Sequence, residues 1–292
     1  DVMLENEIYP LHIMWESDFL SSVANLFKDL FSQADQLAGG GFLEHLTEAK
    51  DRVLELTLAR AGFRMWGEMK ENAQLASEHS SNKGAIQLVA QHVEQAKKKL
   101  DSKDKTGWEL HIVGHSAGSI FAAYALPLLS NLGIPLKSVQ FLAPAIRIDT
   151  FKKLLLPSLE SVHTPLPSLY LLSDKLERDD CVGPYAKSLL YLVSNAFEGS
   201  RGVPILGMQS CLDADKSLAR LLGGKVDGRP ALVVSEGNPI APAQEKAAIA
   251  QGASVSHSHG GFDNDPVTMN SVLTRVLDGV PKRLFTSRDL SY

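Results

Sequence analysis

Cysteine, long apolar runs and excess basic charge are all scarce in this chain of 292 residues. Its two cysteines, Cys181 and Cys211, are too few for a disulfide framework, and a cytoplasmic location is the default expectation. No run of about 18 apolar residues appears, so the sequence predicts no transmembrane segment. The 29 Lys and Arg residues against 34 Asp and Glu leave a formal charge of −5, which argues against nucleic acid as a partner. The chain begins at Asp1 without a basic and apolar leader, so its true N-terminus is left open. The sequence also does not indicate an oligomeric state.

What is present is an ordinary globular composition, with 44% hydrophobic, 22% charged and 7% aromatic residues. From residue 108 onward, predicted strands alternate with predicted helices. We expect strands at 108–113, 137–143, 168–172 and 231–235, and helices at 117–129, 151–156, 185–197, 243–250 and 267–277. Such alternation indicates a doubly wound α/β fold, in which a mostly parallel sheet has helices on both faces. Residues 1–292 are therefore expected to form a single α/β domain.

The first third of the chain has a different pattern. A short β-rich run at 8–15 predicts a first strand, and residues 19–100 then show the apolar spacing of helices. A crossover between two strands needs only one helix and short loops, so we expect 19–100 to form a helical cap over one end of the sheet. The apolar side chains of this cap are expected either to line a substrate pocket or to fill the cap's own core. They include Phe27, Phe31, Phe42, Leu43, Phe63, Met65 and Trp66.

The strongest motif is Gly114-His115-Ser116-Ala117-Gly118, which lies between a predicted buried strand and a predicted apolar helix. A Gly-x-Ser-x-Gly turn in this context holds its serine in a strained conformation with the hydroxyl exposed above the sheet. We expect that a Cβ atom at Gly114 or Gly118 would collide with neighbouring backbone. The helix N-terminus beside the serine favours developing negative charge. Ser116 is therefore the candidate nucleophile.

A serine nucleophile needs a base, and of nine histidines only His163, His257 and His259 follow the helix after Ser116. His163 precedes Thr-Pro in a connection, where a surface role is expected. His257 and His259 lie in a Gly-rich loop before the last helix, and we prefer His259 because the glycines after it leave its ring room to approach Ser116. A metal site made of His257, His259, Asp263 and Asp265 is the rival interpretation of this loop, but His-x-His alone fits no standard zinc spacing and Asp265 is expected to cap the last helix.

The base in turn needs a carboxylate to orient it. Asp174 is the first choice because it follows the strand at 168–172 and therefore lies at the same sheet edge as Ser116. Its structural alternative is a capping-box pair with Glu177 at the start of a short helix. Asp180 is the runner-up, since Asp180-Cys181-Val182-Gly183-Pro184 also has the form of an acid turn. Glu236 is a third choice, whereas Asn238 carries no charge to stabilise an imidazolium.

Through the Gly-His-Ser-Ala-Gly motif, Asp174 and His259, residues 108–277 resemble the α/β-hydrolase superfamily. The resemblance implies a Ser-His-Asp triad of Ser116, His259 and Asp174 and an acyl-enzyme intermediate. It also implies an oxyanion hole that uses the backbone N–H of Ala117, and it requires no metal or organic cofactor.

One feature departs from the pattern of that superfamily. The superfamily usually supplies a second oxyanion donor from a His-Gly loop after an early strand, but the early run here ends Met14-Trp15-Glu16. Either Trp15 or Glu16 donates its N–H, or the early strands lie upstream of Asp1, and the scarcity of strands favours the second explanation. The glycines at 39–41 follow a helix rather than a strand, so we expect only a flexible connection there.

The sequence therefore predicts a serine hydrolase that cleaves small carboxylic esters, with a preference for hydrophobic ones. A thioesterase, an amidase or an acyltransferase uses the same triad and is separated from an esterase only by its acyl pocket and its access to water. A non-catalytic binding domain of the same fold is the alternative from another class.

Overall fold

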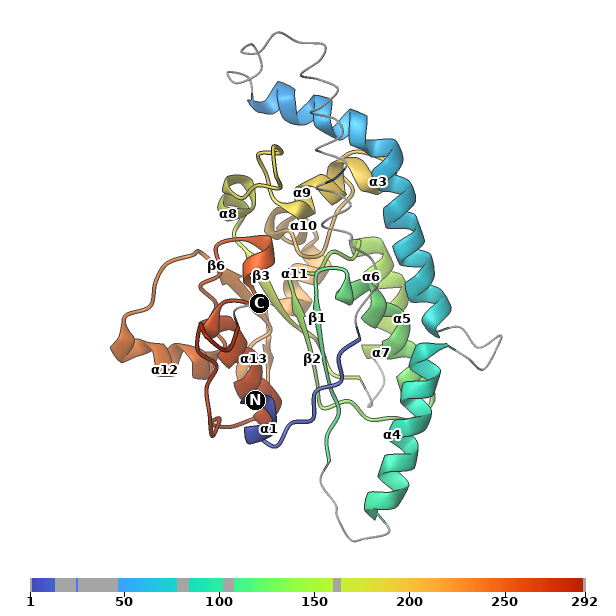
Figure 1. Cartoon of the computed structure of the whole chain (residues 1–292), viewed down its shortest axis with the longest axis vertical. Coiled ribbons are helices and arrows are strands. Elements are labelled where there is room, and N and C mark those ends of the chain that lie inside the picture. Colours follow the sequence, from blue (N-terminus) through green and yellow to red (C-terminus); the bar gives the residue numbers. More distant parts are fainter. Residues whose placement is uncertain are drawn as a thin grey trace.

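The chain folds around one parallel sheet of four strands. The computed structural model describes residues 2–13, 25, 47–77, 84–101, 108–159 and 164–290. The strands are β1 His111–His115, β2 Ser138–Leu142, β3 Ser168–Leu172 and β6 Leu232–Ser235. They pair in the order β1-β2-β3-β6 and every pairing is parallel (Figure 1). The predicted parallel sheet and the place of each of its four strands are confirmed.

The two middle strands of the sheet explain why the sequence pattern is so clear. Every residue of β2 and of β3 is buried; β3 is a nearly continuous apolar run, and β2 is apolar apart from Ser138 and Gln140. Strands that are covered on both faces have this composition because no position faces water. β1 lies at the edge of the sheet in the part of the chain that is described, and Val113 in β1 is 45% exposed.

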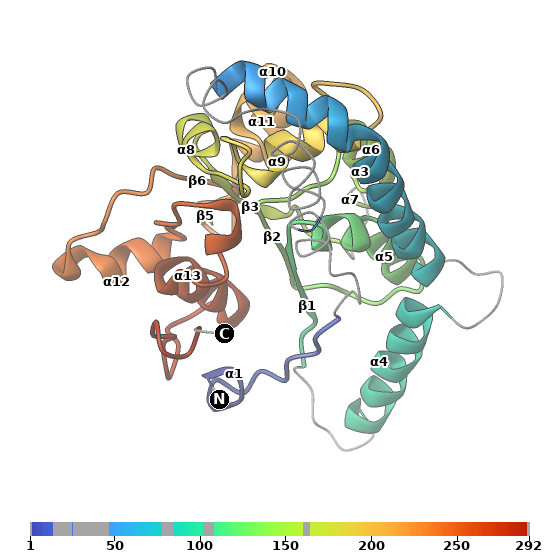
Figure 2. The same cartoon turned by 45° about the horizontal axis from the view of Figure 1, so that its top comes forward.

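Helices lie on both sides of this sheet. On one side are α5 Gly118–Asn131, α6 Ile148–Leu154 and α7 Leu156–Leu159, together with α3 Thr47–Ser77 and α4 Ala85–Asp101. On the other side are α12 Pro242–Gln251 and α13 Pro266–Leu277 (Figures 1 and 2). Asp265 caps α13 as predicted, because its carboxylate accepts hydrogen bonds from the N–H groups of Val267 and Thr268 at 3.0 and 3.1 Å.

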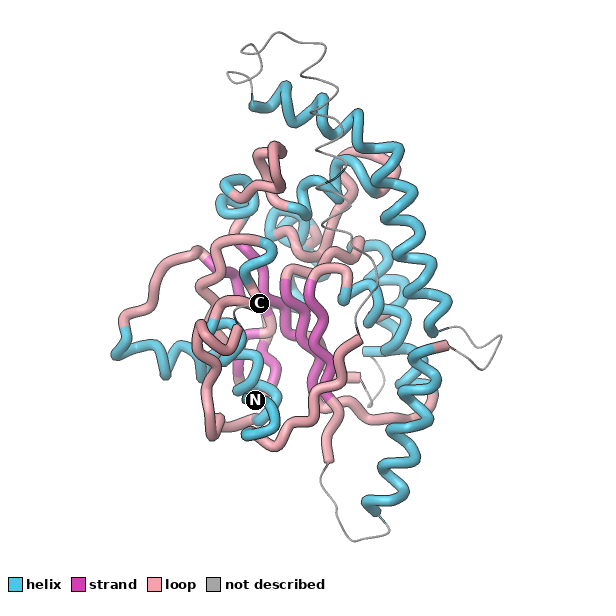
Figure 3. Tube along the Cα trace, in the orientation of Figure 1, coloured by secondary structure: helices cyan, strands magenta, loops and turns pink. Residues whose placement is uncertain are grey.

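Several short elements connect the strands to these helices (Figure 3). They are α8 Asp174–Asp179, α9 Leu189–Leu192, the π-helical segment Val193–Phe197, α10 Gln209–Ala214, α11 Lys216–Leu222, the hairpin of β4 Lys225–Val226 and β5 Arg229–Pro230, and the 3-10 turn His259–Gly261. The helix predicted at 185–197 begins only at Leu189 and ends in the π-helical segment, so that prediction is partly wrong.

The strand predicted at 8–15 is also wrong for the residues that are described. The helix α1 Val2–Glu5 is followed by irregular chain, and Tyr9 and Leu11 are 86% and 62% exposed. Exposed side chains gain nothing from a buried strand, which explains why the β-rich run forms none. Residues 14 and 15 lie outside the described residues. Asn6 joins this segment to the end of the chain, because its side-chain amide donates to the Arg283 carbonyl oxygen at 2.8 Å.

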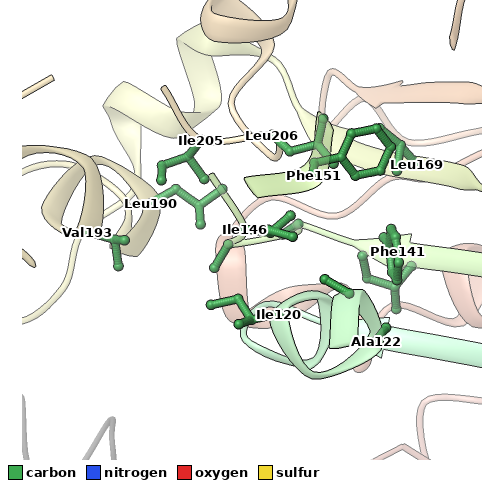
Figure 4. Packing of buried hydrophobic residues seen from close by; sticks show 14 of the residues in the cluster. Ile120, Ala122, Phe141, Ile146, Phe151, Leu169, Leu190, Val193, Ile205 and Leu206 are labelled. Atoms are coloured by element: carbon green, nitrogen blue, oxygen red, sulfur yellow. The ribbon is translucent and has the colours of Figure 1, made fainter. Parts of the chain in front are cut away.

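One hydrophobic core joins the sheet to the surrounding helices. Figure 4 shows Ile120 and Ala122 of α5 beside Phe141 of β2, with Leu190 and Val193 nearby. All of these belong to a single buried cluster. The same cluster includes the apolar side of α3, namely Leu54, Leu58, Trp66, Met69 and Ala73.

The position of α3 bears on the predicted cap. Trp66 is fully buried and its Nε1–H donates to Glu198 Oε1 at 2.5 Å, so the helix packs against the body of the domain through its own apolar stripe. Phe63 is 49% exposed and Met65 is half-buried. Residues 19–24 and 26–46, with the glycines at 39–41 and four of the apolar residues assigned to the cap, lie outside the described residues. None of the described helices is long and apolar enough to cross a bilayer.

Candidate active site

Ser116 lies in the tight turn between β1 and α5, as the motif predicts. Its φ angle is +52°, a left-handed conformation that is strained for any residue other than glycine. The surrounding backbone holds it there, because the Ser116 N–H donates to the Leu142 carbonyl oxygen at 2.9 Å and the Ser116 carbonyl accepts from the Ala145 N–H at 3.0 Å. The end of β2 therefore holds the turn that presents the serine.

The two glycines of the motif differ in the space that each would leave for a Cβ atom. A Cβ atom at Gly114 would lie 3.0 Å from the carbonyl carbon and oxygen of Gly118, so the turn requires glycine at position 114. A Cβ atom at Gly118 would meet nothing within 4 Å. The predicted collision at Gly118 is therefore wrong, since its Cα faces open space at the start of α5.

The structure brings His259 to Ser116, with Nε2 lying 2.9 Å from Ser116 Oγ. His259 is in the 3-10 turn between β6 and α13, and its side chain is buried. His257 is exposed and lies instead against the turn after β6, where a Cβ atom at Gly237 would be 2.6 Å from His257 Nδ1. His163 lies outside the described residues. The contact predicted for the serine is thus made by His259.

The environment of His259 keeps its ring neutral. Burial lowers the pKa of His259 to about 3, the charge of His115 acts in the same direction, and that of Asp263 opposes it. A neutral imidazole has one nitrogen free to accept a proton, and here Nε2 faces the Ser116 hydroxyl. The other nitrogen, Nδ1, is buried and has no hydrogen-bond partner in the part of the chain that the structure describes. The ring is thus placed to take a proton from Ser116 through Nε2.

Asp174, the first choice for the orienting acid, does not contact that nitrogen. Its Oδ1 accepts from the Tyr191 hydroxyl at 2.7 Å and its Oδ2 accepts from Arg178 Nε at 2.7 Å. Hydrogen bonds to these two groups lower the pKa of Asp174 against the opposing effect of burial. Asp174 is the first residue of α8, and its carboxylate bonds to Arg178 of the same helix and to Tyr191 of α9. The prediction that Asp174 receives a hydrogen bond from His259 is therefore wrong in this structure.

Asp180 is the carboxylate that contacts His259. Its Oδ2 accepts from the backbone N–H of His259 at 2.8 Å, and its Oδ1 accepts from the Cys181 N–H at 2.8 Å. The runner-up from the sequence thus lies beside the base. Glu236 and Asn238, the further alternatives, are both exposed.

The capping box predicted for Asp174 and Glu177 is not formed. Ser173 caps α8 by accepting from the Leu176 N–H at 3.4 Å, and Glu177 is buried and accepts a hydrogen bond from the Ser188 hydroxyl. Burial raises the pKa of Glu177 to about 8, so this carboxyl is neutral at pH 7. The spacing of residues in the sequence did not indicate that Glu177, which lies between Asp174 and Asp180, is buried.

The turn also offers a donor for developing negative charge. The Ala117 N–H lies at the N-terminal end of α5 and has no backbone acceptor among the described residues. Trp15 and Glu16, considered as second donors, lie outside the described residues. Helix N-termini and free N–H groups stabilise oxyanions, which makes the Ala117 N–H a candidate oxyanion donor.

The rival metal site was tested on the same loop. Asp265 caps α13 with both of its oxygens, and no three His, Cys, Asp or Glu residues of the described chain gather in an arrangement that suits a metal ion.

Comparison with protein-family models, with curated proteins and with solved structures finds no match to this chain. The interpretation of the site therefore depends on its own geometry.

Proposed function

We propose that this chain is a serine hydrolase of the α/β-hydrolase type, which cleaves carboxylic esters through an acyl-enzyme intermediate. The observation that carries the proposal is the contact between Ser116 and His259. A serine in a strained strand-to-helix turn has its Oγ 2.9 Å from the Nε2 of a buried histidine. Nucleophile and base within hydrogen-bond reach are the signature of covalent catalysis by serine.

In the proposed mechanism, Ser116 Oγ attacks the carbonyl carbon of the ester while His259 Nε2 takes the hydroxyl proton. The carbonyl oxygen becomes an oxyanion and accepts a hydrogen bond from the Ala117 N–H. His259 then returns the proton to the leaving alcohol, and the acyl group remains on Ser116. A water molecule, deprotonated by His259 in the same way, releases the carboxylic acid and restores the serine.

We assign the orienting role to Asp180 rather than Asp174. The carboxylate of Asp180 already accepts a hydrogen bond from the backbone N–H of His259. It therefore lies beside the residue whose ring becomes charged during the reaction. The Nδ1 of His259 has no hydrogen-bond partner among the described residues. Catalytic hydrogen bonds are often long before substrate binds and shorten in the complex. We therefore expect Asp180 to accept the Nδ1–H once the imidazolium forms.

The substrate class follows from the chemistry of the site. Ser116, His259 and Asp180 act without a metal or an organic cofactor, so an ester and water are sufficient. The preference for hydrophobic esters stays a prediction, because the described part of the proposed cap uses Trp66 and its neighbours for packing.

Covalent labelling tests the proposal. We expect a fluorophosphonate probe to form one adduct, on Ser116, in the folded chain, and we expect Ser116→Ala to abolish it. Gly118→Ala, where a methyl group meets nothing within 4 Å, is a matched control within the same turn and should still be labelled. A folded wild-type chain that takes up no label would contradict the proposal and would favour a binding module.

A further inference from the structure

His115, the residue before Ser116, makes two contacts that the proposed mechanism does not use. Its Nε2 lies 2.9 Å from the carbonyl oxygen of His259, and its Nδ1 lies 3.6 Å from Asp263 Oδ2. The rings of His115 and His259 have centroids 5.5 Å apart. His115 occupies a variable position of the Gly-x-Ser-x-Gly motif, so the motif assigns it no role.

The partners of His115 determine where its protons lie. A carbonyl oxygen only accepts, so Nε2 must carry a hydrogen whenever it bonds to His259. The bond to the His259 carbonyl therefore depends on the Nε2–H of His115 and not on Nδ1.

We propose that His115 is a positioning residue for the base of this site. The peptide groups on the two sides of His259 are held by different partners: Asp180 accepts its N–H at 2.8 Å, and His115 donates to its carbonyl. Asp263 Oδ2 faces the other ring nitrogen of His115, Nδ1, at 3.6 Å, a distance beyond a hydrogen bond. Through its bond to the carbonyl, His115 ties the loop that carries His259 to the same turn that carries Ser116.

This arrangement explains why one short segment carries both groups. His115 and Ser116 are adjacent in the chain. Any shift of the turn therefore moves Ser116 and the hydrogen-bond donor to His259 together. The distance between Ser116 Oγ and His259 Nε2 is therefore kept even though the two residues come from distant parts of the sequence. A displacement of about 1 Å between reacting groups costs as much as about 100-fold in rate.

Three substitutions at one position test the proposal, which depends on the proposed hydrolase function. Gln places its amide nitrogen where Nε2 was and keeps a donor to the His259 carbonyl, whereas Asn places it near Nδ1 and Ala removes it. We expect His115→Ala and His115→Asn to lower kcat for a p-nitrophenyl ester about 10- to 100-fold with little change in KM. We expect His115→Gln to stay within about threefold of wild type, because its donor remains.

A matched control is available on the same strand. His111 of β1 bonds through Nδ1 to Ser138 Oγ at 2.8 Å and contacts neither His259 nor Ser116, so His111→Gln should leave kcat unchanged. Circular dichroism of each variant checks that it is folded. The rate of fluorophosphonate labelling should follow the same order as kcat.

The outcomes separate the two proposals. Wild-type protein that is neither labelled nor active would overturn the hydrolase function itself. Active wild type with equally active His115→Ala and His115→Asn would overturn only the positioning role. Loss of activity in all three His115 variants, Gln included, would also overturn it, because the retained donor would then have no effect.

Discussion

His259 combines burial with a neutral ring, and this has a consequence for stability. Burial holds its pKa at about 3, against an ordinary value of 6.5. Between these values the unfolded chain binds a proton that the folded chain does not bind, so this residue makes stability fall as the pH falls. The limiting slope for one such group is about 1.4 kcal/mol per pH unit.

The comparison that isolates this effect is wild type against His259→Gln. Urea unfolding between about pH 7 and about pH 4 should show that wild type loses stability faster than the variant as the pH is lowered. All other titrating groups are common to both proteins and cancel in the difference. Parallel pH curves for the two proteins would mean that the pKa of His259 is the same in the folded and the unfolded chain.

The acid of the site gives a second prediction for single residues. Asp180→Asn should lower kcat by about 10⁴-fold, because a neutral amide favours the wrong tautomer of His259 and cannot stabilise its charge. Asp174→Asn is the control: its carboxylate binds Tyr191 and Arg178, so ester turnover should change little. Steady-state kinetics on both variants decides the assignment. A dead Asp174→Asn protein beside an active Asp180→Asn protein would reverse it.

At this scale, the sequence predicted the contact between Ser116 and His259 but not the carboxylate that lies beside them. Ser116 and His259 are recognisable because glycines and their place before a helix mark each of them. Asp174 and Asp180 differ only in which way the chain turns after β3. That direction depends on the Ser173 cap of α8 and on Tyr191, a contact 17 residues away that local patterns do not report.

The strand-to-helix turn yields a prediction at the level of elements. Gly114→Ala places a methyl group 3.0 Å from backbone atoms of Gly118, so the turn must shift and Ser116 with it. We expect a loss of about 1–3 kcal/mol in unfolding free energy and a clear loss of fluorophosphonate labelling. Gly118→Ala should change both by little, since its methyl group enters open space. Equal behaviour of the two variants would contradict the role assigned to Gly114.

The predictability of the elements follows their burial. β2 and β3 were placed correctly because each is a buried stretch of mostly apolar residues between polar segments. The elements that were missed, α10, α11 and the β4–β5 hairpin, are only two to seven residues long, too short for a periodic pattern. A short helix at Asp174, where α8 begins, was the structural alternative considered for that residue. The run at 8–13 has β-rich composition but no neighbouring strand to pair with in the described chain, and it remains irregular.

For the molecule as a whole, α3 is held to the domain by buried charges as well as by apolar packing. Asp51 is buried, and its carboxylate accepts from Lys187 Nζ at 2.9 Å and from the Ala186 N–H at 3.0 Å. Glu55 accepts from the Tyr185 hydroxyl at 3.0 Å one turn further along. These contacts join the long helix in Figure 1 to the segment before α9.

Removing one partner of such a pair leaves the other charge buried. Asp51→Ala should lower the unfolding free energy by about 3 kcal/mol, because Lys187 loses its buried carboxylate and keeps the exposed Glu48 and the Tyr185 ring as partners. The double variant with Lys187→Met should recover most of the loss. Urea unfolding of the three proteins measures this, and an unchanged stability of Asp51→Ala would show that α3 is held by its apolar stripe alone.

The most direct test of the account is the covalent intermediate. Wild-type protein mixed with p-nitrophenyl acetate and quenched in acid within the first turnovers should carry an acetyl group on Ser116, located by peptide mass spectrometry. The release of p-nitrophenol should show a burst that approaches one equivalent per chain, and His259→Gln should show neither. Steady turnover of the ester by a Ser116→Ala chain, or wild-type turnover with the acetyl group on another residue, would contradict the assignment of Ser116 as nucleophile.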